Sequence, residues 1–221
     1  MSILVVGSTK GGSGKSTLAT NIAIARAITG RSVLLIDGDE QRSALEFTEL
    51  RSEIMEDVGY TAVSMQDRLL KAQAVAMAAK YDDTIIDVGG RVNLSLMAAM
   101  IIAHTVLIPV QPRSFDILAV GQMMTMVEKA REANKNNLRV LAVLNAADPG
   151  PAAKDNEGTL GFLKTFGGLE VLDKITIGRR KVFSSAAANG KSVLEYLPKD
   201  QKAIDEINAL VDALYPKAIS V

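Results

Sequence analysis

Five short runs of apolar residues recur along the chain, and they are almost continuous rather than alternating with polar residues. The runs are Ile3–Val6, Val33–Ile36, Thr84–Val88, Thr105–Val110 and Val140–Leu144. Runs of this kind are typical of strands that are covered on both faces, as in a parallel sheet. The pattern therefore predicts a sheet of buried, largely parallel strands.

Segments with helical spacing lie between these runs. We expect helices over Thr17–Thr29, Gln66–Lys80, Asn93–Ala103, Asp116–Asn134 and Asp200–Leu214. Because strand and helix alternate, the sequence predicts an α/β fold with a doubly wound, mostly parallel twisted sheet flanked by helices. The length of 221 residues suits a single domain, residues 1–221.

Two regions call for a separate interpretation. The segment from Asp148 to Pro151 predicts a surface loop, which the polar stretch through Gly158 extends. The most apolar region, Leu94–Val110, approaches the length of a membrane span, but His104 and Pro109 interrupt it. We therefore interpret that region as a buried helix followed by a buried strand.

Composition narrows the chemistry. There are no cysteines, which excludes disulfides, thiolate metal sites and cysteine nucleophiles. The hydrophobic fraction is 48% with only 4% aromatic residues, so the core must be aliphatic, and we expect methionines 97, 100, 123, 124 and 126 to pack in it or at an interface. The 25 basic and 25 acidic residues argue against a protein coated in positive charge but allow a local basic patch. The N-terminus lacks the features of a secretory signal, which favours the cytoplasm.

The segment between the first strand and the first helix has the composition of a phosphate-binding loop. Its residues are Lys10, Gly11, Gly12, Ser13, Gly14, Lys15, Ser16 and Thr17. Glycines let backbone N–H groups approach phosphates closely, and the N-terminus of the next helix adds partial positive charge. Lys15 is expected to reach the β- and γ-phosphates of ATP, and the Ser16 hydroxyl to ligate Mg²⁺.

The loop departs from the usual spacing G-x-x-x-x-G-K-[ST], because Thr9 stands where the first glycine belongs. A second lysine, Lys10, opens the loop instead. Such a lysine either neutralises phosphate charge in its own site or acts, like an arginine finger, in a second site. Sequence alone leaves both roles open.

Carboxylates follow two of the predicted strands. Asp37 and Asp39 come at the end of one, and Asp87 ends another, in the string Ile85-Ile86-Asp87-Val88-Gly89. Ligands of open α/β sheets bind beyond the carboxyl ends of the strands, so these groups are expected near the phosphate loop. The alternative for Asp37 or Asp39 is that one of them only caps the next helix.

The loop KGGSGKST resembles the deviant Walker A motif, xKGGxGK[ST], of the ParA/MinD superfamily of P-loop NTPases. The resemblance implies that Lys10 reaches across an ATP-dependent homodimer, that Asp37 lies near the Mg²⁺ hydration shell and that Asp39 positions the attacking water. It also implies that Asp87, as the Walker B residue, holds Mg²⁺ through water. Glu40 departs from the proline of the family's D-x-D-P-Q string.

The resemblance continues further along the chain. Asn145 falls where family members use an asparagine to contact adenine, although a strand-end turn is the simpler interpretation. Ile177–Phe183 and Ala188–Glu195 look like a looser family segment. Together these matches extend from Ser2 to Glu195 and imply an ATP hydrolase that uses ATP and Mg²⁺.

The ends of the chain indicate a subgroup. No stretch precedes the first strand, so we expect no N-terminal helix-turn-helix, and Ile207–Val221 does not look like a basic membrane-targeting helix. The chain is thus most similar to the small, ParF-like ParA proteins. This implies non-specific DNA binding, nucleoid association, a ParB-like or cargo-adaptor partner, no membrane, and segregation or positioning of a plasmid, chromosome or other cargo.

The candidate DNA contacts are four basic residues in the last quarter of the chain. They are Arg179, Arg180, Lys181 and Lys202. A solvated loop or the rim of the nucleotide pocket is an equally simple interpretation of the first three. The alternatives for the whole protein are an ATP-dependent metabolic synthetase of the same superfamily, a MinD-like membrane switch and an accessory protein for DNA transfer.

Overall fold

The computed structural model describes residues 1–89, 94–112, 117–149 and 153–216. Seven strands form one sheet in the order β3-β2-β4-β1-β5-β6-β7, and every neighbouring pair is parallel. The strands are β1 (Ser2–Ser8), β2 (Val33–Asp37), β3 (Thr61–Ser64), β4 (Asp83–Gly89), β5 (Thr105–Val110), β6 (Arg139–Ala147) and β7 (Glu170–Gly178). The predicted parallel sheet is confirmed.

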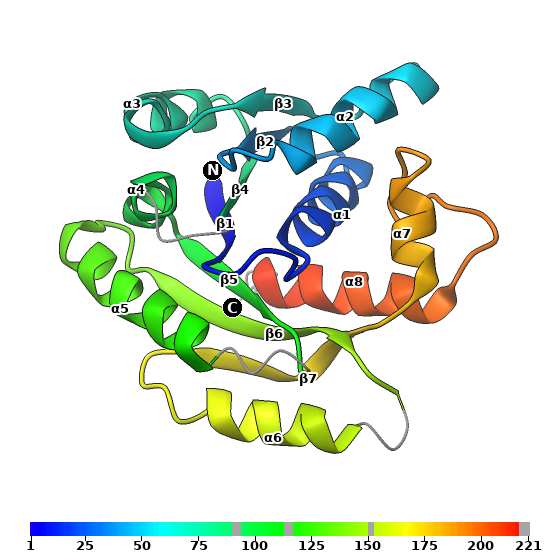
Figure 1. Cartoon of the computed structure of the whole chain (residues 1–221). Coiled ribbons are helices and arrows are strands. Elements are labelled where there is room, and N and C mark those ends of the chain that lie inside the picture. Colours follow the sequence, from blue (N-terminus) through cyan, green and yellow to red (C-terminus); the bar gives the residue numbers. More distant parts are fainter. Residues whose placement is uncertain (90–93, 113–116, 150–152, 217–221) are drawn as a thin grey trace, which may run out of the picture.

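Helices cover both faces of the sheet, which makes three layers (Figure 1). One face carries α1 (Lys15–Ile28), α2 (Ser43–Ile54), α7 (Lys181–Ala187) and α8 (Gln201–Leu214). The other carries α3 (Asp67–Ala78), α4 (Leu94–Ile102), α5 (Ile117–Ala133) and α6 (Ala153–Leu163). The predicted starts at Asn93 and Asp116 lie outside the described residues.

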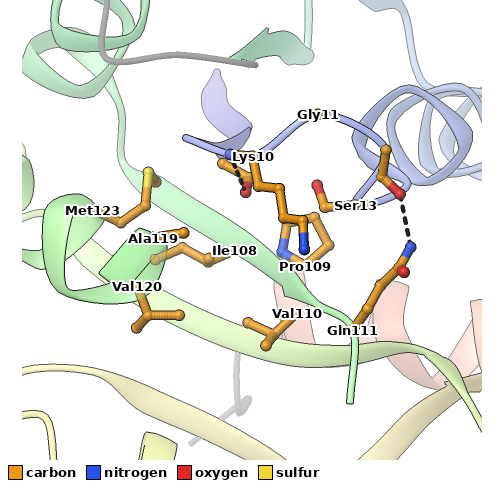
Figure 2. A pocket seen from close by; sticks show the side chains of 12 residues that line it. Lys10, Gly11, Ser13, Ile108, Pro109, Val110, Gln111, Ala119, Val120 and Met123 are labelled. Carbon is orange, nitrogen blue, oxygen red and sulfur yellow. Dashed lines mark hydrogen bonds between the residues drawn. The ribbon is translucent and has the colours of Figure 1, made fainter. Parts of the chain in front are cut away.

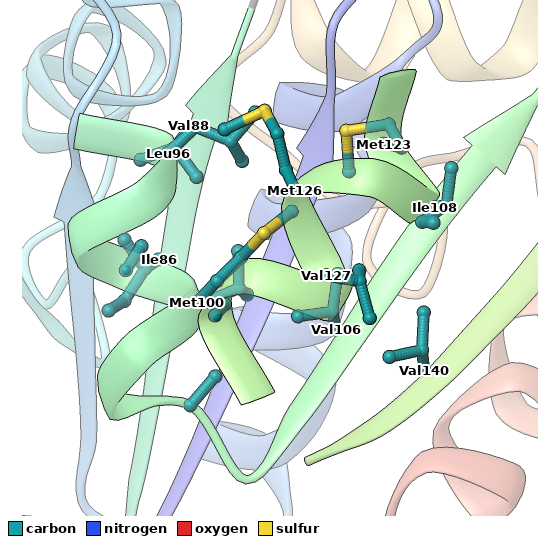
Figure 3. Close-up of a cluster of buried hydrophobic side chains, with 14 of the residues drawn as sticks. Ile86, Val88, Leu96, Met100, Val106, Ile108, Met123, Met126, Val127 and Val140 are labelled. Carbon is teal, nitrogen blue, oxygen red and sulfur yellow. The ribbon is translucent and has the colours of Figure 1, made fainter. Parts of the chain in front are cut away.

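Two hydrophobic clusters lie on opposite faces of the sheet because side chains alternate along each strand. Ile3 and Val5 belong to the cluster under α3, α4 and α5, whereas Leu4 and Val6 belong to the cluster under α1 and α8. The predicted methionines pack in the first cluster, as Figure 3 shows for Met100, Met123 and Met126 among aliphatic neighbours. The aliphatic core is therefore confirmed.

Several elements differ from expectation. The loop predicted through Gly158 is wrong from residue 153 onward, because α6 begins there and packs Leu163 into the core. The polar character of this stretch favoured a loop, but the tertiary packing of α6 overrode that local signal. Helices α2 and α7 and the strands β3 and β7 were also not predicted. No helix of the described residues is long and apolar enough to cross a membrane, and Leu94–Val110 folds as α4 and β5, as expected.

His104 lies just after α4, and its ring serves the backbone. Its Nδ1 accepts a hydrogen bond from the N–H of Ile3 at 3.1 Å. Burial lowers the pKa of His104, which matches this acceptor role of the neutral ring. His104 is therefore a structural residue that follows the end of α4.

Candidate functional site

The phosphate-loop residues connect β1, at the centre of the sheet, to α1. Gly14 is the N-cap of α1, with φ of 90°, and no side chain caps the helix. No acidic residue lies in its first turn. Among the described residues, the N–H groups of residues 11–14 donate no hydrogen bond of good geometry. The loop and helix end thus present free donors and a positive dipole end to an anion.

Lys15 is held inside this site. It is buried, and its Nζ lies 3.5 Å from the carbonyl oxygen of Lys10. Its Cε passes so close to Gly89 that a Cβ there would lie 2.9 Å away, and the same Cβ would collide with the carbonyl of Ser8. Gly89, with φ of 139°, therefore lets the end of β4 approach the lysine and the loop.

Asp37 and Asp87 are paired in register at the carboxyl ends of β2 and β4. The two oxygens of Asp37 accept the N–H of Asp39 at 3.0 Å and the N–H of Leu45, in the first turn of α2, at 2.9 Å. Asp37 therefore also caps the start of α2. Burial raises the pKa of Asp37, although these two N–H groups favour its ionised form.

Asp87 is bonded differently. Both of its oxygens are buried, and neither accepts a hydrogen bond of good geometry from any described residue. Burial raises the pKa of Asp87 to about 7; the Ser16 hydroxyl opposes the shift, Asp37 adds to it, and Lys15 opposes it. A buried carboxylate without partners is costly unless a cation compensates it.

These residues fit a hydrated Mg²⁺ ion. Mg²⁺ prefers oxygen ligands and keeps several waters, with one or two carboxylates near it. Asp87 supplies a buried oxygen pair that accepts no hydrogen bond of good geometry from a described residue, and the Ser16 hydroxyl and Asp37 lie close enough to affect its pKa. The structure brings Ser16, Asp37 and Asp87 together, and their role as metal ligands stays a prediction.

Asp39 lies at the edge of the same site, and its side chain is partly exposed. One of its carboxylate oxygens accepts the N–H of Gln41 at 3.0 Å, and its backbone carbonyl accepts Gln66 Nε2 at 3.2 Å. The group thus stays in contact with solvent beside the buried pair Asp37 and Asp87. This placement suits a carboxylate that orients a water molecule.

Lys10 opens the loop, and its side chain is half-buried. Its N–H donates to Ser8 Oγ at 3.2 Å, and its side chain lines a pocket together with Ser13 of the loop. Figure 2 shows this side chain running past Pro109 of β5, with Val120 and Met123 of α5 on the other side of the pocket. The Lys10 side chain therefore extends from the loop toward the end of β5.

Two carboxamides from neighbouring strand ends bind the loop. Asn145 Nδ2, at the end of β6, donates to the Ser13 carbonyl at 2.7 Å, and Gln111 Nε2, just after β5, donates to the Gly12 carbonyl at 2.7 Å. For Asn145 the sequence suggested an adenine contact or a turn, and neither predicts this bond. Gln111 was not a candidate, although its position after a buried strand was a usable signal.

The DNA candidates gather around α8, but two of them are paired. Arg179 contacts Asp148 at 3.1 Å, and Arg180 contacts Glu206 of α8 at 2.7 Å. Lys181 is exposed in the first turn of α7, and Lys202 is exposed on α8, one turn from Glu206. Arg180 is the only one of the four that is partly buried, and Arg179, although exposed, is paired with Asp148.

The segment Ala188–Glu195 is fixed to α2 by a buried ion pair. Arg51 donates to both oxygens of Glu195, at 2.8 and 2.7 Å, and to the Gly190 carbonyl at 2.9 Å. The Arg51 side chain is only 4% exposed. Gly190 has φ of 59° and lies against the Arg51 backbone, where a Cβ would meet the Arg51 Cα at 2.7 Å. This ion pair between Arg51 and Glu195 connects the chain before α8 to α2.

Known proteins resemble this chain over most of its length. Residues 4–193 match the family described as CobQ/CobB/MinD/ParA nucleotide binding domain. The chain is 30% identical over 216 residues to the "Maintenance of carboxysome distribution protein A" of Halothiobacillus neapolitanus, with 96% of each chain covered. Both findings agree with the resemblance carried by the phosphate loop.

Two solved structures share the fold. Apo McdA of Cyanothece has a TM-score of 0.79 at 19% identity, covering 97% of this chain and 99% of that one. A plasmid partition protein of Borrelia burgdorferi B31, bound to AMPPNP, has a TM-score of 0.74 at 20% identity, covering 96% of this chain and 98% of that one. The chain belongs to the CobQ/CobB/MinD/ParA family of nucleotide-binding domains.

Proposed function

We propose that the protein is an ATP-driven positioning switch that binds Mg²⁺ and ATP, dimerises, binds DNA without sequence preference and releases it after slow hydrolysis. The observation that carries the proposal is the meeting of a phosphate loop that opens with Lys10 and the three carboxylates Asp37, Asp39 and Asp87 at one edge of the sheet. Family membership supports the nucleotide.

The nucleotide would lie with its phosphates on the loop residues Lys10–Thr17. The free N–H groups of residues 11–14 and the end of α1 favour the phosphate charge. Lys15 would contact the β- and γ-phosphates. Ser16, Asp37 and Asp87 would hold the hydrated Mg²⁺, which when bound neutralises charge that develops on the phosphates.

Hydrolysis of the terminal phosphate needs an oriented water and stabilised charge more than a covalent group. Asp39 is the carboxylate with solvent access at this edge, so it would orient the water. Lys15 would stabilise charge from within the site. A basal rate set by this arrangement alone would be slow, which leaves room for a partner that accelerates it.

Dimerisation would complete the site through Lys10. This side chain opens the loop and lines the pocket beside it. A lysine supplied in trans would act like an arginine finger. ATP would then control assembly as well as supply energy.

Binding to DNA would use the exposed lysines near α8. Arg179 and Arg180 are engaged by Asp148 and Glu206, so Lys181 and Lys202 are the stronger candidates for phosphate contacts. Such contacts are electrostatic and independent of sequence. A cytoplasmic, nucleoid-associated protein follows from this part of the proposal.

The cargo would be engaged through an adaptor or ParB-like protein. The relative from H. neapolitanus is named for the distribution of carboxysomes, and a structural neighbour is a plasmid partition protein. A protein cluster or compartment is therefore a better first candidate for the cargo than a plasmid, because the former relative has the higher sequence identity.

The proposal is tested by DNA retention in three nucleotide states. A labelled duplex of random sequence is titrated with the protein in Mg²⁺ and ATP, in Mg²⁺ and ADP, and without nucleotide. We expect strong retention with ATP only, weakened by added salt. Equal binding in all states, or no binding with ATP, contradicts the proposal.

Charge reversals locate the surface. We expect Lys181→Glu combined with Lys202→Glu to abolish retention. The matched control is Lys71→Glu combined with Lys129→Glu, which changes the same charge on exposed positions of α3 and α5, across the sheet. An equal loss of DNA retention in both double variants would show that retention depends only on the total charge of the protein.

A further inference from the structure

The bonds from Gln111 and Asn145 fall on successive peptide groups of the phosphate loop. Gln111 Nε2 binds the carbonyl of Gly12, and Asn145 Nδ2 binds the carbonyl of Ser13, each at 2.7 Å. The two amides come from the ends of β5 and β6, which are neighbouring strands of the rigid sheet. Figure 2 shows Gln111 reaching the loop from the end of β5.

Because of the geometry of the peptide bond, these two hydrogen bonds also constrain the N–H groups that follow the two carbonyls. In a trans peptide the C=O of one residue points opposite to the N–H of the next. Fixing the Gly12 carbonyl therefore fixes the N–H of Ser13, and fixing the Ser13 carbonyl fixes the N–H of Gly14. Neither N–H group donates a hydrogen bond of good geometry to a described residue. By the same peptide geometry, both lie on the side away from the two amides.

The loop has little rigidity of its own at these positions. Gly12 and Gly14 have φ of 74° and 90°, and a Cβ at Gly12 would meet nothing within 4 Å. Glycines lose more conformational freedom on ordering than other residues. A phosphate that had to order this segment itself would bind less tightly, and preformed hydrogen bonds remove that cost.

Asn145 is packed as a fixed support rather than as a free side chain. It is 7% exposed, and a Cβ at Gly14 would collide with its Nδ2. Gly14 is therefore needed for the amide to reach the loop as well as for its own backbone conformation. The side-chain nitrogen of Asn145 is already committed to Ser13.

We infer that Gln111 and Asn145 are positioning residues that hold the N–H groups of Ser13 and Gly14 toward the phosphates of the nucleotide. The inference rests on the proposed binding of nucleotide phosphates to this loop. It gives Asn145 a role on the phosphate side of the site and adds Gln111 to the residues on which phosphate affinity depends.

The test uses neutral variants that keep side-chain size but cannot donate. These are Gln111→Met and Asn145→Leu; a carboxylate at either position would repel phosphate by its charge alone. The matched control is Gln122→Met, at an exposed position of α5. Calorimetry measures the Kd of the full chain for two ligands with Mg²⁺: ATP and inorganic tripolyphosphate, which has no base.

We expect each variant to weaken ATP and tripolyphosphate by the same factor, about tenfold or more, because a positioned donor set is lost. The control should bind both ligands like the wild type. Loss of ATP affinity alone in Asn145→Leu, with tripolyphosphate unchanged, would assign that residue to the base and overturn the inference for it. Unchanged affinity for both ligands would overturn it for either residue.

Thermal unfolding separates this role from a general loss of structure. Variants that bind weakly but unfold within a few degrees of the wild type support positioning; weak binding accompanied by a large fall in Tm contradicts it. A wild type that binds neither ligand would instead refute the proposed function, and normal wild-type binding with unaffected variants would refute only the inference.

Discussion

Asp37 and Asp87 are directly paired on β2 and β4, yet only Asp37 has its carboxylate satisfied by protein donors. The protein thus has one acid that is held by two backbone N–H groups and caps α2, and beside it one buried acid without such bonds. The second is the group whose pKa is raised to about 7. This asymmetry predicts different responses to pH and to metal.

Removing the charge of Asp87 should stabilise the metal-free protein at high pH. The folded-state pKa of about 7 exceeds the ordinary value of 3.8, so between these values the folded state binds more protons than the unfolded state. Wild-type stability therefore falls as pH rises through this window, by up to about 1.4 kcal/mol per pH unit. We measure the free energy of unfolding in urea from pH 5 to 8. We expect it to fall less steeply with rising pH in Asp87→Asn than in the wild type.

Asp37, whose pKa is also raised, is present in both proteins. The free energy of unfolding of Asp87→Asn should therefore still fall somewhat as the pH rises. Asp212→Asn, at an exposed position of α8, is the control and should follow the wild type. An Asp87→Asn variant with the full wild-type slope would show that Asp87 is not the group that titrates.

Mg²⁺ and ATP should stabilise the wild type more than they stabilise Asp87→Asn. When Mg²⁺ and ATP bind the folded state, they stabilise it by mass action. We expect the wild type to gain several degrees in Tm with Mg²⁺ and ATP at pH 8, and Asp87→Asn to gain much less. A gain of equal size in both proteins, or the same wild-type gain with ATP and EDTA, argues against a metal at Asp87.

Lys15→Ala should remove nucleotide binding. Lys15 is buried beside the loop, and no other lysine occupies that place among the described residues. We expect at least a hundredfold weaker binding of ATP in a fluorescence titration, because a charge-assisted contact to phosphate is lost at a desolvated site. Lys129→Ala, exposed on α5, should bind normally; retained affinity in Lys15→Ala would mean that the phosphates lie elsewhere.

The ion pair between Arg51 and Glu195 should contribute more to the free energy of unfolding than exposed ion pairs do. Glu195→Gln leaves a buried guanidinium without its charge partner, which typically costs about 3–5 kcal/mol. The comparison is Glu170→Gln, which breaks the more exposed pair with Arg139 and should cost about 1 kcal/mol or less. Chemical denaturation measures both, and equal costs would show that Arg51 is compensated by the carbonyls of Val58 and Gly190 alone.

The central sheet and the phosphate loop could be predicted because their signals are local. Continuous apolar runs indicated β1, β2, β4, β5 and β6, and the string from Lys10 to Thr17 identified its own chemistry. The carboxylates Asp37 and Asp87 followed from one rule about strand ends. Nothing beyond local pattern was needed for these features.

The remainder depended on tertiary contacts. Helix α2 buries only Ala44, Thr48 and Arg51, so its inner face is largely polar and carries no apolar periodicity. The edge strand β7 fully buries only Leu172 and Ile177, unlike the continuously buried central strands. The amides of Gln111 and Asn145 meet loop residues about 100 and 132 positions away, and no local pattern encodes such a meeting.

The central claim, that ATP controls assembly, is tested most directly by the mass of Asp39→Ala in solution. This variant should bind ATP but not turn it over, so the ATP state persists during light scattering. With Mg²⁺ and ATP we predict twice the monomer mass of 23.5 kDa, and the monomer mass with ADP, without nucleotide, or when Lys10→Ala is added. A monomer with ATP, or a dimer in every state, would contradict the account.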